Sequence, residues 1–347
     1  MRVMLLAPEF DGSCGVLDYS HRLAAALARL DVDIRIAHGG REGRLSLRAL
    51  AAELRAGRPS VLHLQYPMAG FGASLVPQLA TGLTALPCVV TLHEFSQVHP
   101  LRRLASLAFS RADALIFTTP EERDAFCRWR PGSHRRSTVV PLGSNIPCLV
   151  EGEAGFMDAG HRDLDSICYF GQLRPRRGIE ALLALARLAA RRAPRLQFLV
   201  LGAVPVGREP YVQSLRDTCG DLPNLAWELD HDQAEVARIL ARQGFAYLPY
   251  PDGVSGRRGS LLAALGNGVL VITTPGRQIP PGLRAAVAFA GDPEAALTRI
   301  ERLRASTEAR RVQRAAADAW MRDRGWQSIA ERHLALYRRL SGADDEQ

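Results

Sequence analysis

The chain has 347 residues, which is enough for about two domains of ordinary size. Hydrophobic residues make up 47% of it, charged residues 23% and aromatic residues 6%, and this composition excludes a disordered, collagen-like or coiled-coil chain. All 44 basic residues are arginines, and the formal net charge of +8 at pH 7 favours anionic partners, with phosphates of nucleotides, nucleic acids or lipids as the alternatives.

The sequence gives no sign of a membrane span or a secretory signal. No uncharged apolar run reaches about 18 residues, and the first apolar run ends at Glu9 and Asp11 without a small-residue cleavage site. The six cysteines are scattered singly with no C-x-x-C spacing, which favours free thiols in a reducing compartment. We therefore expect a cytoplasmic protein without a structural metal.

The first half of the chain repeats a short continuous apolar run, a turn and an amphipathic stretch. This is the pattern of buried parallel strands joined by crossover helices. The predicted strands are 3–7, 33–37, 61–64, 89–92, 114–118 and 138–141, and the predicted helices include 19–30, 45–57, 101–111 and 120–129. The alternation predicts βαβ units in a doubly wound α/β domain over residues 1–150.

The periodicity fails between residues 149 and 165, where we place a linker, and then restarts. It predicts a second Rossmann-like domain over residues 164–324. Its strands are expected at 167–170, 197–202, 225–228, 245–249, 269–273 and 287–289, and its helices at 178–192, 210–218, 234–243 and 259–266. The tail 307–340 is helical in pattern, and its part 325–340 is expected to pack back on the first domain.

Two loops are candidates for binding an anion, because ligands of doubly wound sheets bind outside the carboxyl ends of the strands. The first loop contains Gly12 and Gly15 and leads into a helix beginning near Asp18, so its backbone N–H groups can approach a phosphate. An ordinary glycine turn is the alternative. Neither a P-loop nor the G-x-G-x-x-G dinucleotide fingerprint is present.

The second loop places three arginines, Arg174, Arg176 and Arg177, between Gly171 and Gly178. They lie between a predicted strand and the N-terminus of a predicted helix, where guanidinium groups can grip phosphate oxygens bidentately. The alternative is a solvated run of charge. The cleft between the two domains is the expected site for both loops.

Six segments in this order resemble the GT-B glycosyltransferases of retaining family 4, which includes sucrose-synthase-like enzymes and mannosyltransferases. They are Ala7-Pro8-Glu9-Phe10 with the following glycines, the stretch 61–67, Thr91-Leu92-His93-Glu94, the stretch 140–145, the stretch 170–178, and 262–271 followed by Thr273-Thr274-Pro275. The resemblance covers nearly the whole chain and implies two Rossmann-like domains with a cleft between them.

The resemblance also implies roles for single residues. The backbone around Gly15 would face the diphosphate of a nucleotide-sugar donor, Arg177 would grip that diphosphate, and Arg174 would support it. His93 would be the catalytic histidine near the transferred sugar, with a buried core histidine as the alternative. Asp18, Glu94 and Ser255 would lie near the sugar or the acceptor.

The chain departs from the family at its two glutamates spaced E-x7-E. Ser255 and Ala263 stand at the matching positions, so neither carboxylate is present. The segment 255–260 looks instead like a variant S-E-R-R-G-S pattern in which Gly256 replaces the glutamate. Within it Arg257, Arg258 and the N–H groups from Gly259 and Ser260 at a helix start are candidates for binding phosphate.

Together these features predict an enzyme that moves a hexose from a nucleotide-diphosphate sugar to a hydroxyl of a glycan, glycolipid or small molecule, without a cofactor or a metal. Two alternatives are a catalytically silent homologue that serves as a nucleotide- or protein-binding scaffold, and a nucleotide-sugar epimerase. The Asp230-His231-Asp232 motif is not specific for a metal, and we expect Asp232 to cap a helix. No basic–aromatic pattern of a nucleic-acid site occurs.

One predicted helix, 101–111, carries apolar Leu104, Leu107 and Ala108 on one face, with arginines at positions 102, 103 and 111 toward its flanks. Such a helix can rest on an anionic membrane surface, so peripheral contact at the inner face is a possible addition to a cytoplasmic location. The alternative is a helix packed on the sheet.

Overall fold

The computed structural model describes residues 1–8, 14–40, 45–96, 98–149, 162–220, 222–277 and 279–342. Within them the chain divides into two compact units. Unit 1 is Met1–Gly143 with Asp323–Gln347, and unit 2 is Ser144–Arg322. The division at residues 143 and 144 comes before the predicted linker, most of which lies outside the described residues.

Unit 1 is built on a parallel sheet in the order β2-β1-β3-β4-β5-β6. Its strands are β1 (Arg2–Leu6), β2 (Asp33–Ala37), β3 (Val61–Tyr66), β4 (Cys88–Leu92), β5 (Ala114–Phe117) and β6 (Ser137–Val139). Its helices are α1 (Gly15–Ala28), α2 (Leu47–Gly57), α3 (Val76–Leu83), α4 (Pro100–Ser106), α5 (Pro120–Trp129) and α13 (Trp326–Ser341), with short 3-10 helices at Ala69–Phe71, Leu107–Arg111 and Pro131–Arg136.

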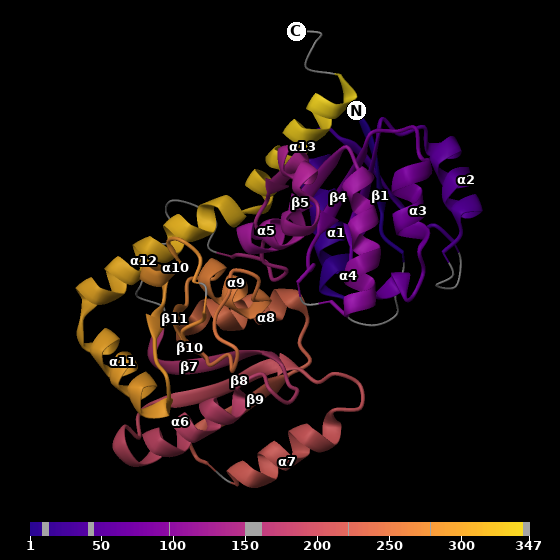
Figure 1. Cartoon of the computed structure of the whole chain (residues 1–347). Helices are drawn as coiled ribbons and strands as arrows, with labels where there is room; N and C mark the ends of the chain where they lie inside the picture. The colour runs from indigo at the N-terminus through magenta and orange to yellow at the C-terminus, as the bar shows by residue number, and fades with distance from the viewer. Residues whose placement is uncertain are drawn as a thin grey trace. The chain divides into compact units, whose positions relative to one another are not determined.

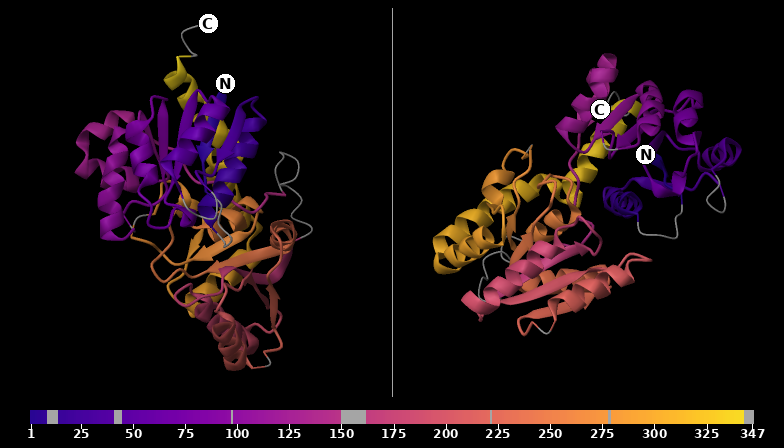
Figure 2. Two further views of the ribbon diagram at one scale, coloured as in Figure 1. Left: turned by 90° about the vertical axis from the view of Figure 1, so that its right-hand side faces the viewer. Right: turned by 60° about the horizontal axis from the view of Figure 1, so that its bottom comes forward.

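Both faces of this sheet are covered, as the left view of Figure 2 shows. One face packs on α1 and α13, and the other on α2, α5 and the segments around α3. Along β3 successive residues alternate between these two cores, so Leu62 and Leu64 face one side while Val61 and His63 face α13. Helix α13 runs beside α1 (Figure 1), although almost the whole chain separates them in sequence.

Unit 2 has a second parallel sheet, in the order β12-β11-β10-β7-β8-β9. Its strands are β7 (Asp163–Gln172), β8 (Gln197–Ala203), β9 (Leu225–Leu229), β10 (Gln243–Leu248), β11 (Leu270–Thr273) and β12 (Ala288–Phe289). Its helices are α6 (Ile179–Arg192), α7 (Glu209–Cys219), α8 (Gln233–Arg242), α9 (Gly259–Gly266), α10 (Leu283–Ala286), α11 (Pro293–Ala305) and α12 (Thr307–Met321).

The chain leaves β7 toward β8 and β9 and later returns to the other side of β7 with β10. The direction of winding therefore reverses between β7 and β10, and a crevice forms at the carboxyl ends of strands on either side of such a point. On one face of the sheet α6, α7 and α11 form the core, and α9 packs against β7, β10 and β11. The predicted doubly wound α/β class is confirmed in both units.

Three predicted elements need correction. Helix α1 begins at Gly15 rather than near Asp18, so Asp18 lies in its first turn. The predicted helix 101–111 is instead α4 up to Ser106 followed by a 3-10 turn, which rotates Leu107 into the core while Leu104 stays exposed. The predicted helical tail is broken into α12 and α13 by a 3-10 turn at Arg322–Arg324.

Candidate functional site

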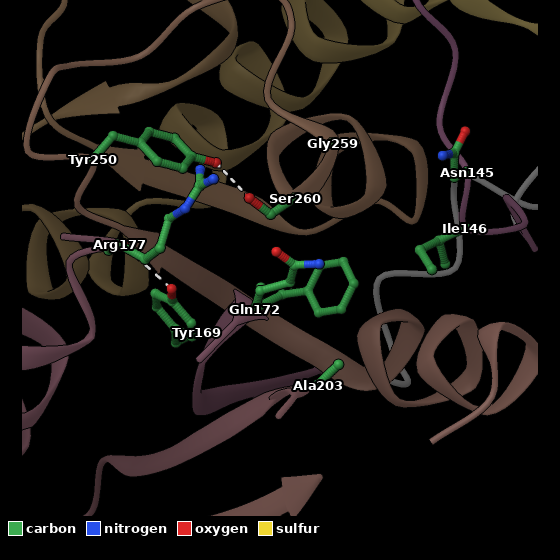
Figure 3. A pocket seen from close by; sticks show the side chains of 11 residues that line it. Asn145, Ile146, Tyr169, Gln172, Arg177, Ala203, Tyr250, Gly259 and Ser260 are labelled. Atoms are coloured by element: carbon green, nitrogen blue, oxygen red, sulfur yellow. Dashed lines mark hydrogen bonds between the residues drawn. The ribbon is translucent and has the colours of Figure 1, made fainter. Parts of the chain in front are cut away.

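A pocket of about 260 Å³ lies in unit 2 at the carboxyl ends of β7, β8 and β10 (Figure 3). Residues 169–172 of β7 line it, Ala203 ends β8 directly opposite Gln172, and Tyr250 follows β10. The remaining lining residues are Asn145, Ile146, Arg177, Gly259 and Ser260. The pocket therefore lies at the point where the sheet changes its winding direction, which is where open α/β sheets bind ligands.

The arginine loop is anchored to the sheet at the end that leads into α6. The Tyr169 hydroxyl donates to the Arg177 backbone carbonyl at 3.2 Å. Gly178 has φ +87° as the N-cap of α6, and a Cβ there would stand 1.8 Å from the Pro249 carbonyl oxygen. Only glycine fits this approach, so the chain brings Arg177 and Tyr250 to the same pocket. In Figure 3 the Arg177 side chain extends toward the Tyr250 ring.

Across the pocket from the arginine loop, the chain leads into helix α9, which begins at Gly259. The Tyr250 and Ser260 hydroxyls are 2.8 Å apart, and burial raises the pKa of Tyr250 well above its usual range, so that phenol stays protonated. The first N–H groups of α9 have no side-chain cap, and they carry the positive end of the helix dipole. The pocket thus combines one guanidinium, three hydroxyls and a helix N-terminus, which suits an anionic group.

The structure brings together some of the predicted phosphate-binding residues and leaves others aside. Gly171, Arg177, Gly259 and Ser260 line the pocket. Arg174, Ser255, Arg257 and Arg258 are not among its lining residues. The Arg258 guanidinium lies over the Tyr250 ring at 4.7 Å and pairs with Asp252. It therefore supports Tyr250, which lines the pocket.

Sequence reasoning missed several pocket residues. Asn145 is the last residue of the segment 140–145 that resembles the family, and neither Asn145 nor Tyr250 was predicted to bind the donor. Gln172 and Ala203 carried no signal in the sequence, because only the register of β7 against β8 places them side by side. Gly12 lies outside the described residues. Asp232 does cap its helix, accepting from the Glu235 N–H at 2.7 Å, as expected.

In unit 1, His93 follows the last residue of β4 and is only 4% exposed. Its backbone N–H donates to the Tyr66 carbonyl at 2.8 Å, and its ring meets the edge of the Tyr19 ring with centroids 4.9 Å apart. Tyr19 adjoins Asp18 in the first turn of α1, and Gly15 begins that helix, so these predicted residues lie at one edge of the sheet. Glu94 is exposed next to His93.

A chain of buried polar groups continues from His93 into the core. The His93 Nε2–H donates to the Gln65 Oε1 at 2.7 Å, and the Gln65 amide donates to the His63 Nε2 at 3.2 Å. The Thr91 hydroxyl also donates to that nitrogen, at 2.8 Å. The His63 Nδ1–H must then donate to the Tyr337 hydroxyl at 2.6 Å, which ties β3 to α13.

These contacts fix the protonation of the histidines. Because His63 accepts at one nitrogen and donates at the other, it is neutral, and burial lowers its pKa well below the usual value. Burial also lowers the pKa of His333 to about 4. Glu122 holds the loop after His93 by accepting from the Phe95 and Ser96 N–H groups at 2.6 and 2.8 Å.

Within the described ranges, no group of three or more His, Cys, Asp or Glu side chains is placed to hold a metal ion. The same residues include no helix that is both long and apolar enough to cross a membrane.

Residues 37–143 match the family model of a glycosyl transferase 4-like domain. No curated protein sequence matches the chain. Among solved structures, sucrose-phosphate synthase from Thermosynechococcus elongatus is similar at 17% identity, with 99% of each chain covered and a TM-score of 0.70. HepE from Anabaena in complex with UDP has 13% identity over 97% of this chain and 99% of that chain, with a TM-score of 0.70.

A glycosyltransferase from Rickettsia africae has 11% identity over 98% of each chain, with a TM-score of 0.69. The two units have the GT-B fold of these glycosyltransferases, which confirms the fold class that the sequence motifs predicted. The residues that match the glycosyl transferase 4-like domain lie in the first unit and include His93.

Proposed function

We propose that this protein transfers a hexose from a nucleotide-diphosphate sugar, held by unit 2, to a hydroxyl of a glycan, glycolipid or small-molecule acceptor. The observation that carries the proposal is the pocket at the winding reversal of the second sheet, where Arg177 faces the start of α9. The similar HepE structure holds UDP, so UDP-sugars are the first donors to test.

In the proposed reaction the bond from the sugar C1 to the diphosphate oxygen breaks, and a bond from C1 to the acceptor oxygen forms. The leaving diphosphate gains negative charge as its bond breaks. Arg177 and the first N–H groups of α9 are fixed before the reaction, so they stabilise that charge without reorganising. The acceptor hydroxyl loses its proton, and we assign His93 the role of accepting or relaying it.

The reaction is proposed to need no metal, because a guanidinium and a helix N-terminus can supply the positive charge that a divalent cation supplies elsewhere. Purified protein treated with EDTA should keep its transfer activity. Complete loss, restored by Mn²⁺ or Mg²⁺, would show that the two groups do not suffice. The treated protein should also bind its donor as tightly as the untreated protein does.

A thermal-shift screen with UDP, GDP, ADP and TDP sugars tests the donor and identifies the base. A donor that raises the unfolding temperature is then assayed for release of the nucleoside diphosphate and for transfer to added acceptors. We expect one base to stabilise the protein and its sugar to be released. Absence of a shift with every donor would refute the proposed donor site.

The second candidate is a silent homologue that binds a nucleotide without turnover. Ser255 and Ala263 favour it, because they stand where the family has two glutamates. The same screen separates the candidates. A scaffold shows a thermal shift and neither hydrolysis nor transfer with any donor that binds.

A further inference from the structure

Helix α3 of unit 1 presents leucines to solvent on one face. Leu75, Leu79 and Leu83 recur every four residues, which places them in a row along the helix, and each is exposed, Leu83 to 71%. A helix that packs on a sheet normally turns such a row inward. Here the buried residues of α3 are small or polar, including Ala80 and Thr81, and the leucines point outward.

The chain segment that contains this row lacks charged residues. No Asp, Glu or Arg occurs anywhere from Pro59 to His93, a stretch that includes the whole of α3 and the loops on either side of it. The other exposed residues near the helix, Gly72, Ala73, Gly82 and Ala85, are small and uncharged. An apolar row in uncharged surroundings is unusual for an exposed helix and marks an interaction surface.

Helix α4 adds two more leucines, Leu101 and Leu104, which are 72% and 62% exposed. The 3-10 helix that continues α4 packs against α3, and Figure 1 shows both labelled helices on unit 1. We call the five exposed leucines of α3 and α4, with the N-cap Leu75 included, the leucine patch. It is formed by residues that belong to one unit.

Arginines border the leucine patch. The Arg102 guanidinium donates to the Gly72 carbonyl at 2.7 Å, which holds that side chain against the loop leading into α3. The Arg111 guanidinium lies beside Gly82 near the other end of α3. Arg103 packs on the Phe95 ring. Against these three, Asp113 is the single acidic residue between positions 100 and 113.

We infer that the leucine patch is a docking surface for an anionic lipid bilayer. The exposed leucines of α3 and α4 can enter the acyl boundary, while the flanking arginines contact phosphate headgroups. The excess of positive over negative charge at the border favours anionic lipid as the occupant. This inference rests on the proposed function, because docking would bring unit 1 to a lipid-linked acceptor hydroxyl.

Flotation of the full-length protein with vesicles tests the inference without any assay of activity. One set of vesicles contains phosphatidylcholine alone, and the other contains about one third phosphatidylglycerol. We expect the protein to float with the anionic vesicles and to remain behind with the neutral ones. Added salt should weaken the binding, because surface charges are screened.

Leu83→Glu and Leu101→Glu each place a carboxylate in the leucine patch and should reduce vesicle binding at least about tenfold. Val206→Glu is the matched control, because Val206 is 99% exposed in unit 2, and it should bind as the unaltered protein does. Both patch residues are on the surface, so the variants should keep their circular dichroism and donor-induced thermal shift.

Two results would overturn the inference. The first is no flotation of the unaltered protein, or flotation that the patch variants retain. The second is a dimer of the unaltered protein that Leu83→Glu converts to a monomer with no vesicle binding, which would make the patch a contact between two copies. If the patch variants lose flotation but keep the donor-induced thermal shift, the result supports docking. If the unaltered protein floats but no donor raises its unfolding temperature, only the proposed function is refuted.

Discussion

At the scale of single residues, the chemistry proposed for unit 1 depends on a neutral His63 that the core holds in one protonation state. The Tyr337 hydroxyl accepts from its Nδ1–H, and the Thr91 hydroxyl donates to its Nε2. The Gln65 amide also donates to that Nε2, and its oxygen accepts from the His93 Nε2–H. In the proposed reaction Gln65 is a positioning residue, because it accepts from the His93 Nε2–H and so holds the ring.

The proposed role of His93 predicts the behaviour of His93→Gln. Turnover should fall by about 10²- to 10⁴-fold, the usual cost of losing an acid–base group, while donor affinity stays nearly unchanged. Steady-state kinetics and calorimetry with the identified donor measure both. His99→Gln is the control, because His99 caps α4 on the surface of the same unit. Full turnover in His93→Gln with an unaltered fold would leave His93 as a core histidine.

The burial of His333 predicts a loss of stability in acid. Its pKa is about 4 in the folded chain and about 6.5 when unfolded, so between these values the unfolded state binds more protons. The free energy of unfolding therefore falls as the pH drops from 6.5 toward 4, by about 2 kcal/mol at pH 5 from this group.

Calorimetric unfolding at pH 7 and pH 5 checks this expectation. His333→Gln should lose less stability between the two pH values than the unaltered protein does. The exposed His134 supplies the control variant His134→Gln, whose pH dependence should equal that of the unaltered protein. Equal drops in all three proteins would show that His333 does not carry the effect.

At the scale of elements, the turn from β7 into α6 determines where the donor site forms. Gly178 allows the α6 N-cap to approach the chain after β10, and this approach puts the arginine loop beside Tyr250. Arg177, just before the N-cap of α6, and the first turn of α9 then both contribute to the pocket walls. A change at this one glycine should therefore disturb packing as well as binding.

Gly178→Ala is expected to destabilise the protein by at least about 2 kcal/mol, because the new Cβ meets the Pro249 carbonyl and the φ of +87° disfavours alanine. Gly342→Ala is the matched comparison, since Gly342 is also in the left-handed region, with a φ of +71°, but faces open space. It should cost only about 1 kcal/mol. Urea unfolding of both variants measures the difference, and equal costs would contradict the close-approach argument.

The sequence predicted most strands to within a residue or two, because buried parallel strands are continuous apolar runs bounded by turns. It did not predict α3, whose outward leucines and inward small residues reverse the usual pattern. The prediction of one helix over 101–111 was wrong for a related reason. The change to 3-10 geometry after Ser106 divides the leucines of this segment between the surface and the core.

For the candidate site, sequence reasoning found the arginine loop 171–178 and the segment 255–260 that leads into α9, because glycine and arginine spacing is local information. It could not find Gln172, Ala203 or Asn145, which meet only after the strands pair in register. It also assigned Arg257 and Arg258 to phosphate binding. The pairing of Arg258 with Asp252 and Tyr250 became evident only from the fold, and the role of Arg257 stays a prediction.

At the scale of the whole molecule, two doubly wound units divide the proposed reaction between them. Unit 2 supplies the pocket with its positive charge, and unit 1 supplies His93 and, by our inference, the leucine patch. Helix α13 returns the end of the described chain to unit 1 and links it to β3 through Tyr337. The donor site is the feature on which the rest of the proposed function depends.

Isothermal calorimetry of a nucleotide-diphosphate sugar binding to the unaltered protein and to Arg177→Ala tests that feature most directly. Arg191→Ala, at the far end of α6, removes the same charge outside the pocket. We predict that Arg177→Ala weakens binding by about ten- to a hundredfold, as expected for a lost charge-assisted hydrogen bond, and that Arg191→Ala leaves it unchanged. Equal affinity of all three proteins for the donor would contradict the proposed site.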